Sequence, residues 1–224
     1  MNGHSKMKDT VLITCFNKPF DEKLAAAFVQ RGFRVYAMGS KHAQGVTLLP
    51  CAADEASCAL REKEGKLDFL LDTTDTDEEQ DNFTVRCGIN PQVMERVFRQ
   101  NVLRSMSLLE AFLPLLDEGE GKRLFYLTSA KSSINETRRI DHFGYNMSKT
   151  ALHQFIQMTR NKLFDKGYTF RVFDPVYDEA APEDAAQSAF NYITRRRGTE
   201  NNDPKRDDED NLVFRDAFGR QHCW

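Results

Sequence analysis

Short apolar runs alternate with stretches of helical periodicity along most of this chain. The runs typical of buried strands lie at residues 11–14, 33–38, 46–49, 67–71, 123–128 and 169–173. The stretches with the apolar spacing of one helix face lie at residues 24–31, 53–64, 91–116 and 145–164. This alternation predicts an α/β, Rossmann-like doubly wound fold, with a mainly parallel sheet of six or seven strands and helices on both faces.

We expect the chain to fold as a single domain over residues 1–224. Its 224 residues, 40% of them hydrophobic, suffice for one good core, and no internal repeat divides them. Residues 1–8 hold no apolar signal region and are expected to form a flexible N-terminus. Residues 195–211 are polar and carry both signs of charge, which predicts a mobile, solvated loop.

Charge and cysteine content narrow the possible partners. The net charge of −3 and the pI near 6.0 argue against a nucleic-acid binder. No apolar run approaches the roughly 18 residues that a membrane span needs, so no membrane partner is expected. The five cysteines are odd in number and scattered, without a Cys-x-x-Cys pair. They predict reduced thiols, no metal site and a cytoplasmic location.

Tyr145 and Lys149 are the candidate catalytic pair. On a helix, residues four apart lie on one face, so the ammonium of Lys149 is expected beside the phenol of Tyr145. A neighbouring ammonium favours the phenolate, which lowers the tyrosine pKa from its usual value of about 10. Such a tyrosine can donate or accept the proton of a carbonyl/alcohol pair. Two residues at this spacing are also common as exposed helical neighbours, so the surrounding sequence has to decide.

That surrounding sequence resembles the short-chain dehydrogenase/reductase family over about residues 9–224. The family pairs Tyr-x-x-x-Lys with a serine at the end of the fifth strand and an asparagine in the preceding long helix. Asn101, in the stretch Phe-Arg-Gln-Asn-Val, matches the asparagine. Two serines compete for the other role, Ser129 directly after the fifth strand and Ser132, whose distance from Tyr145 is the commoner family spacing. We favour Ser129, because ligands of open α/β sheets bind at the strand ends.

The resemblance implies an NAD(P)(H)-dependent oxidoreductase that interconverts a small carbonyl and an alcohol. Tyr145 is then the acid/base, and Lys149 lowers its pKa and holds the cofactor ribose. Ser129 is expected to hydrogen-bond the substrate oxygen and Asn101 to support a proton relay. The family also implies a homodimer or homotetramer built through the helices at residues 91–116 and 145–164.

The cofactor half of the family pattern is altered. The family turn Thr-Gly-x-x-x-Gly-x-Gly, whose glycines let backbone amides approach a pyrophosphate, carries Cys15, Pro19 and Asp21 in place of its glycines. Asp21 adds an anion at a helix N-terminus, and Pro19 removes an amide donor. The family Asn-Asn-Ala-Gly reads Asp-Thr-Thr-Asp at residues 72–75, and Pro-Gly after the sixth strand reads Pro-Val at residues 175–176.

These departures leave two functions open. The first is the oxidoreductase, with NADPH favoured because Lys41 suits a 2′-phosphate, unless Lys41 is an ordinary loop lysine. The second is a degenerate, non-catalytic protein of this fold, with weakened or lost dinucleotide binding and a binding, assembly or regulatory role. The residues expected to contact a cofactor are Thr14, Asn17, Lys18, Ser40, Lys41, Asp72, Lys149 and Pro175.

Overall fold

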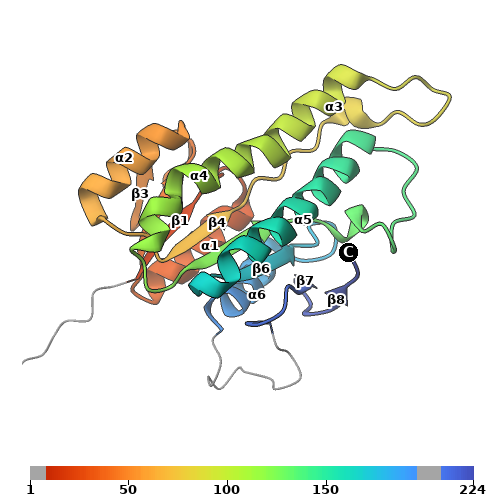
Figure 1. Ribbon diagram of the computed structural model, residues 1–224. Coiled ribbons are helices and arrows are strands. Elements are labelled where there is room, and N and C mark those ends of the chain that lie inside the picture. Colours follow the sequence, from red (N-terminus) through yellow and green to blue (C-terminus); the bar gives the residue numbers. More distant parts are fainter. Residues whose placement is uncertain (1–8, 196–207) are drawn as a thin grey trace, which may run out of the picture.

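The computed structural model describes residues 9–195 and 208–224. The predicted flexible segment 1–8 and most of the predicted loop 195–211 lie outside these residues. Within them, eight strands form one sheet in the order β3-β2-β1-β4-β5-β6-β7-β8 (Figure 1). Neighbouring strands run parallel except for the antiparallel pair β7 and β8. The prediction of a doubly wound, mainly parallel sheet is confirmed.

Each of the six apolar runs forms a strand. The strands are β1 (Thr10–Ile13), β2 (Arg34–Met38), β3 (Val46–Leu49), β4 (Phe69–Asp72), β5 (Arg123–Leu127), β6 (Thr169–Asp174), β7 (Phe214–Asp216) and β8 (Gln221–His222). The sheet exceeds the predicted six or seven strands because the chain turns back after β7. Gly219 takes a left-handed φ of 78° at this turn, a conformation that glycine adopts without strain, and β8 then pairs with β7.

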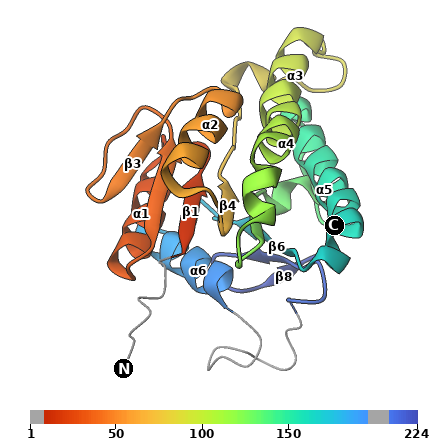
Figure 2. The same ribbon diagram turned by 60° about the vertical axis from the view of Figure 1, so that its left-hand side comes forward.

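Helices cover both faces of the sheet (Figure 2). One face carries α1 (Pro19–Gln30) and α6 (Pro182–Thr194), and the other carries α2 (Ala53–Glu64), α4 (Arg104–Asp117) and α5 (Phe143–Leu163). The helix predicted at residues 91–116 consists of α3 (Pro91–Phe98), a π-helical turn at Arg99–Leu103 and then α4. Helix α6 was not predicted from the sequence.

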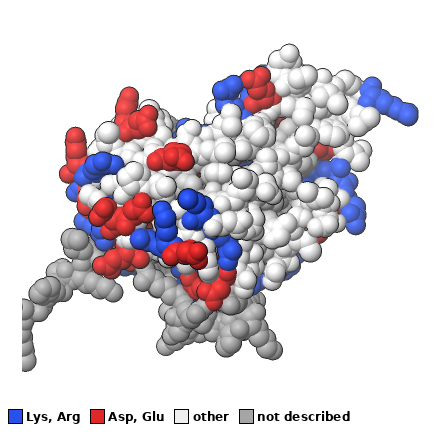
Figure 3. All heavy atoms as spheres, viewed as in Figure 1, with Lys and Arg blue, Asp and Glu red and all other residues white. Residues whose placement is uncertain are grey.

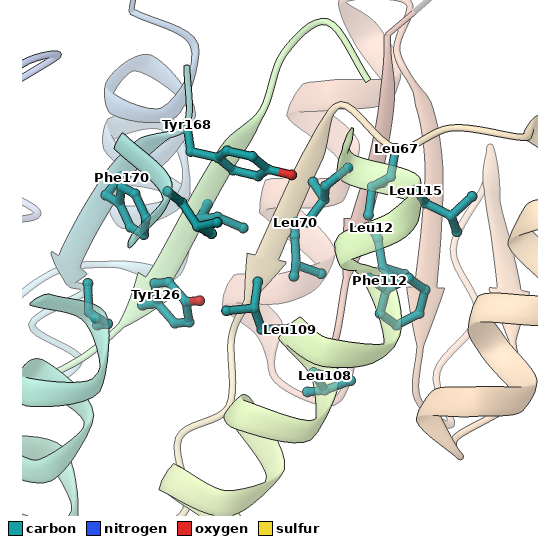
Figure 4. Packing of buried hydrophobic residues seen from close by; sticks show 14 of the residues in the cluster. Leu12, Leu67, Leu70, Leu108, Leu109, Phe112, Leu115, Tyr126, Tyr168 and Phe170 are labelled. Carbon is teal, nitrogen blue, oxygen red and sulfur yellow. The ribbon is translucent and has the colours of Figure 1, made fainter. Parts of the chain in front are cut away.

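Two apolar cores hold these layers together. On the α4 side, Leu12 and Leu70 of the sheet pack against Leu108 and Phe112 (Figure 4). On the α1 and α6 side the core is rich in phenylalanine, and Phe28 packs edge to face on Phe190 across the two helices. Burying each such side chain contributes about 1.5–3 kcal/mol. The parallel strands therefore present their carboxyl ends along one rigid edge, where ligands of this architecture bind.

Candidate active site

Helix α5 begins at the edge formed by the strand ends, and a remote carboxylate fixes its first turn. The side chain of Asp81 accepts hydrogen bonds from the backbone N–H groups of Gly144 (3.0 Å) and Tyr145 (2.7 Å). A Cβ atom on Gly144 would lie only 3.0 Å from the Cα atom of Met94 in α3, so glycine allows the two helices to approach closely here. These contacts hold the Tyr145 side chain, which is 8% exposed, at the strand ends.

Lys149, one turn further along α5, is completely buried. Its ammonium donates hydrogen bonds to the backbone carbonyls of Thr74 (2.8 Å) and Leu127 (3.2 Å), and it lies 3.1 Å from a carboxylate oxygen of Asp75. A lysine ammonium has three donors. Two of them are therefore used by backbone carbonyls, and the ammonium also forms an ion pair with Asp75.

The Asp75 carboxylate lies between the two candidate catalytic side chains. Its Oδ1 atom accepts a hydrogen bond from the Tyr145 hydroxyl at 2.9 Å, and its Oδ2 atom lies 2.7 Å from the ammonium of Lys18. Burial raises the pKa of Asp75, but the ammonium groups of Lys149 and Lys18 outweigh it and hold that pKa well below its usual range. Asp75 is consequently a carboxylate anion at neutral pH.

The prediction that Tyr145 has a lowered pKa is wrong for this structure. The sequence predicted that Lys149 lowers the tyrosine pKa, but burial raises it well above its usual value, and the charge and hydrogen bond of Asp75 raise it further. The physical reason is that Asp75 is an anion bound directly to the phenol, so it opposes the effect of the ammonium. Tyr145 therefore keeps its proton.

Ser129 and Ser132 occupy different settings. Ser129 follows β5, borders the cavity described below and hydrogen-bonds Tyr145, an interaction that opposes the rise in the tyrosine pKa. Ser132 is buried, and its hydroxyl donates to the backbone carbonyl of Ser129 at 2.6 Å. The geometry thus favours Ser129 as the residue that faces a substrate, and its catalytic role stays a prediction.

Asn101 fastens the loop that carries Asp75. The side chain projects from the π-helical turn, where it accepts a hydrogen bond from the Thr76 N–H (2.9 Å) and donates to the Thr76 carbonyl (2.8 Å). It also donates to the Ser148 hydroxyl at 2.9 Å. The amide thus holds a neighbouring backbone segment in place, and its support of a proton relay stays a prediction.

The side chain of Asp21 fills the turn between β1 and α1. The buried carboxylate of Asp21 accepts hydrogen bonds from the N–H groups of Asn17 (3.1 Å) and Lys18 (2.8 Å). Burial raises the pKa of this carboxyl to about 6. The sequence predicted an anion that crowds a phosphate, whereas Asp21 turns inward and takes amide donors of the turn that a phosphate would need.

Other predicted cofactor residues also bond within the protein. The Thr14 hydroxyl donates to Asp72 at 2.8 Å, and the Ser40 hydroxyl donates to the side-chain oxygen of Asn17 at 3.2 Å. Lys41 forms an ion pair with Glu22. Pro175 borders the cavity, and Val176 after it takes a left-handed φ of 49°, the region that favours glycine.

An open cavity of about 370 Å³ lies over these groups and is bordered by Ser129, Tyr145 and Asp75. Tyr177, whose role the sequence did not reveal, closes one side. Its ring centroid lies 4.9 Å from the Lys18 ammonium, which is within range of a cation–π interaction. The cavity is large enough for a small molecule, and the hydroxyl groups of Tyr145 and Ser129 border it.

Structures of known proteins share this architecture. Carbonyl reductase Sniffer of D. melanogaster superposes with a TM-score of 0.80 at 14% identity, covering 97% of this chain and 100% of that one. NADPH-bound carbonyl reductase from chicken fatty liver superposes with a TM-score of 0.78 at 13% identity and the same coverage. The chain has the short-chain dehydrogenase/reductase fold. A carbonyl reductase from Pseudomonas aeruginosa PAO1 in complex with NADP also matches, with a TM-score of 0.75 and 16% identity over 96% of this chain and 100% of that one.

Sequence comparison gives a match over part of the chain. No family model matches the chain. An uncharacterized oxidoreductase of Schizosaccharomyces pombe is 25% identical over 140 residues, which are 62% of this chain and 53% of the relative. The match thus spans about half the length of that curated relative. Together with the shared fold, it agrees with the resemblance found in the sequence.

A dinucleotide fits this site only in part. Tyr145 and Pro175 border the cavity, and Lys149 is buried one helical turn from Tyr145. The amide donors of the β1–α1 turn, however, are taken by Asp21, and the Lys149 ammonium is directed at Asp75. The catalytic end of the site could accept the cofactor if Asp75 moved, whereas the phosphate end lacks free amides in the turn.

Among the described residues, none of the helices is both long and apolar enough to cross a membrane. All five cysteines are free. Asp77, Asp81 and His142 lie close enough together to share a metal ion, but Asp81 already caps α5 and the His142 ring nitrogen lies 2.9 Å from Asp77. We therefore keep the prediction that the protein has no metal site.

Proposed function

We propose that this protein is an NAD(P)(H)-dependent oxidoreductase acting on a small carbonyl or alcohol. The observation that carries the proposal is the convergence of Ser129, Tyr145 and Lys149 at the carboxyl ends of the strands, beside the cavity of about 370 Å³. The curated oxidoreductase relative and the carbonyl reductases of the same fold support it.

The side chains have distinct parts in the proposed reaction. Ser129 holds the substrate oxygen, and Tyr145 gives it a proton as the carbonyl is reduced. Lys149 supplies positive charge beside the phenol and holds the cofactor ribose. The bound dinucleotide supplies the hydride. The raised pKa of Tyr145, which burial causes first, keeps the phenol protonated at neutral pH, the state in which it can give a proton to the substrate oxygen.

We further propose that the protein binds the dinucleotide weakly. A phosphate cannot use the Asn17 and Lys18 amides while Asp21 holds them. These same contacts favour a second candidate, a non-catalytic protein in which Tyr145, Lys149 and Asn101 are retained for structure. We prefer the enzyme because the serine and the tyrosine both border an open cavity, where a purely structural pair has no need to lie.

Turnover separates the two candidates. We would follow NADPH and NADH oxidation at millimolar cofactor with a panel of small aldehydes and ketones, for the unmodified protein and for Tyr145→Phe. The proposal predicts reduction of at least one carbonyl and a loss of about 100-fold or more in Tyr145→Phe, the usual effect of removing a general acid.

Ser129→Ala and Ser132→Ala form a matched pair for the same assay. Ser129→Ala should lower turnover by about tenfold or more, because it removes a hydrogen bond to the reacting oxygen. Ser132→Ala should reduce turnover much less, because that hydroxyl bonds only to the local turn. Equal turnover in unmodified protein and Tyr145→Phe would contradict the role of Tyr145, and no reduction of any carbonyl would favour the non-catalytic candidate.

A further inference from the structure

Asp75 binds the two side chains, Tyr145 and Lys149, that the proposed reaction needs. Asp75 accepts the hydroxyl hydrogen of Tyr145 and forms an ion pair with the buried Lys149 ammonium. It also binds Lys18, both through its carboxylate and through its backbone carbonyl, each at 2.7–2.8 Å. A substrate oxygen and a cofactor ribose therefore compete with Asp75 for the same hydrogens.

The Asp75 carboxylate is held in place, but the open cavity beside it leaves room for the side chain to move. Its loop is tied by the two hydrogen bonds between Asn101 and Thr76 and by the bond from Lys149 to the Thr74 carbonyl. The Asp75 side chain is 10% exposed and borders the open cavity. A change of its rotamer toward the cavity would release both Tyr145 and Lys149 without breaking the contacts of Asn101.

We propose that Asp75 is an internal competitor for the nicotinamide-ribose position, an autoinhibitory contact that must leave Tyr145 and Lys149 before a dinucleotide binds. The inference rests on the proposed function, since it assumes that the dinucleotide uses these two residues. The Asp75 carboxylate is stabilised by the two ammonium groups around it. A neutral ribose that displaces it loses this stabilisation, so the affinity for the dinucleotide is lowered.

Calorimetric titration with NADPH tests the competition. Asp75→Asn keeps the size of the side chain but removes its charge, and Asp75→Gly removes the side chain. Both should bind NADPH about tenfold or more tightly than the unmodified protein. The matched control is Asp77→Asn, which removes the same charge at the border of the same cavity, where the carboxylate contacts His142. Its affinity should stay within about twofold of the unmodified protein.

Fragments of the cofactor localise the effect. Nicotinamide mononucleotide carries the ribose that Asp75 would displace, whereas adenosine 2′,5′-bisphosphate carries only the other half of NADPH. Asp75→Asn should strengthen binding of the first fragment and leave the second unchanged. Equal strengthening of both would mean a general charge effect and would overturn the inference.

Thermal unfolding gives a readout that does not depend on turnover. Removing Asp75 leaves the buried Lys149 ammonium without its anionic partner, so both variants should unfold at a lower temperature than the unmodified protein. Millimolar NADPH should then raise the unfolding temperature of the variants by more than that of the unmodified protein. If Asp75→Asn does not fold, Asp75→Gly carries the test, because glycine is the family residue there.

The outcomes separate the inference from the proposed function. If unmodified protein and the Asp75 variants bind NADPH equally and reduce a carbonyl, the enzyme stands and the competition is wrong. If none of them binds NADPH or either fragment, Asp75 is not what prevents binding. In that case both the inference about Asp75 and the proposed use of a dinucleotide cofactor are wrong.

Discussion

Asp21 and Asp75 stand where the resembling family has glycine, yet their carboxylates lie in opposite electrostatic settings. Both are buried, which by itself raises the pKa of a carboxyl group. Asp75 lies between Lys149 and Lys18, and its pKa falls well below the usual range. Asp21 is held mainly by backbone amides, and burial raises its pKa to about 6. Each aspartate therefore binds hydrogen-bond donors that a dinucleotide would need. Of these two carboxyl groups, only that of Asp21 titrates near neutral pH.

The raised pKa of Asp21 predicts a specific pH dependence of stability. Because the folded protein holds this proton more tightly than the unfolded chain, the Asp21 contribution to the free energy of unfolding falls as pH rises from about 4 to about 6. Asp21→Asn removes this dependence. The difference in unfolding free energy between variant and unmodified protein should change by up to about 3 kcal/mol across that range. Urea unfolding at a series of pH values measures it, and parallel curves would contradict it.

At the scale of elements, the π-helical turn Arg99–Leu103 links α4 to the loop that carries Asp75. An extra residue in the turn is typical of functional sites. Here the turn brings Asn101, which is completely buried, onto both backbone groups of Thr76. The helix and the Asp75 loop therefore form one structural unit, although 25 residues separate the two partners.

Asn101→Ala should destabilise this unit. It removes three hydrogen bonds and leaves polar groups of Thr76 and Ser148 without partners, which should lower the free energy of unfolding by about 2–4 kcal/mol. The control is Ser107→Ala in the same helix, an exposed serine whose hydroxyl donates to the Leu103 carbonyl, with an expected change of about 0.5 kcal/mol or less. Similar small losses in both variants, measured by urea unfolding, would contradict the clamping role of Asn101.

The sequence was sufficient for the fold and for part of the site. Apolar runs and helical spacing predicted six strands and four helical stretches, and the Tyr-x-x-x-Lys spacing placed Tyr145 and Lys149 on one helix face at the strand ends. The pattern could not reveal that Asp75 binds both side chains or that Asn101 holds Thr76. Those contacts depend on the three-dimensional path of the loop after β4, which leaves no periodic signal in the sequence.

At the scale of the whole molecule, α4 and α5 present a broad face with few charged side chains, visible as the white area over these helices (Figure 3). Phe98, Leu103, Met106 and Met158 are between 38% and 62% exposed along a shallow groove between the helices. Contiguous exposed apolar surface of this kind usually marks a protein interface. In the resembling family these helices form the dimer interface, so we propose a homodimer through this face.

Charge placed on that face should separate the two copies. The double variant Met106→Asp, Met158→Asp should be monomeric at micromolar concentration, because association would bury unpaired carboxylates. Ile140→Asp is the control, since Ile140 is 73% exposed but lies in the loop before α5. Size-exclusion chromatography with light scattering gives the mass of each. A monomeric unmodified protein, or a dimeric double variant, would count against this interface.

The most direct test of the account is a crystal structure of the unmodified protein grown with millimolar NADPH. The account predicts a ribose within hydrogen-bond distance of Tyr145 and Lys149, with the Asp75 carboxylate displaced from both toward the cavity. A structure in which the dinucleotide is bound while Asp75 still contacts Tyr145 and Lys149, or in which it binds elsewhere, would contradict it.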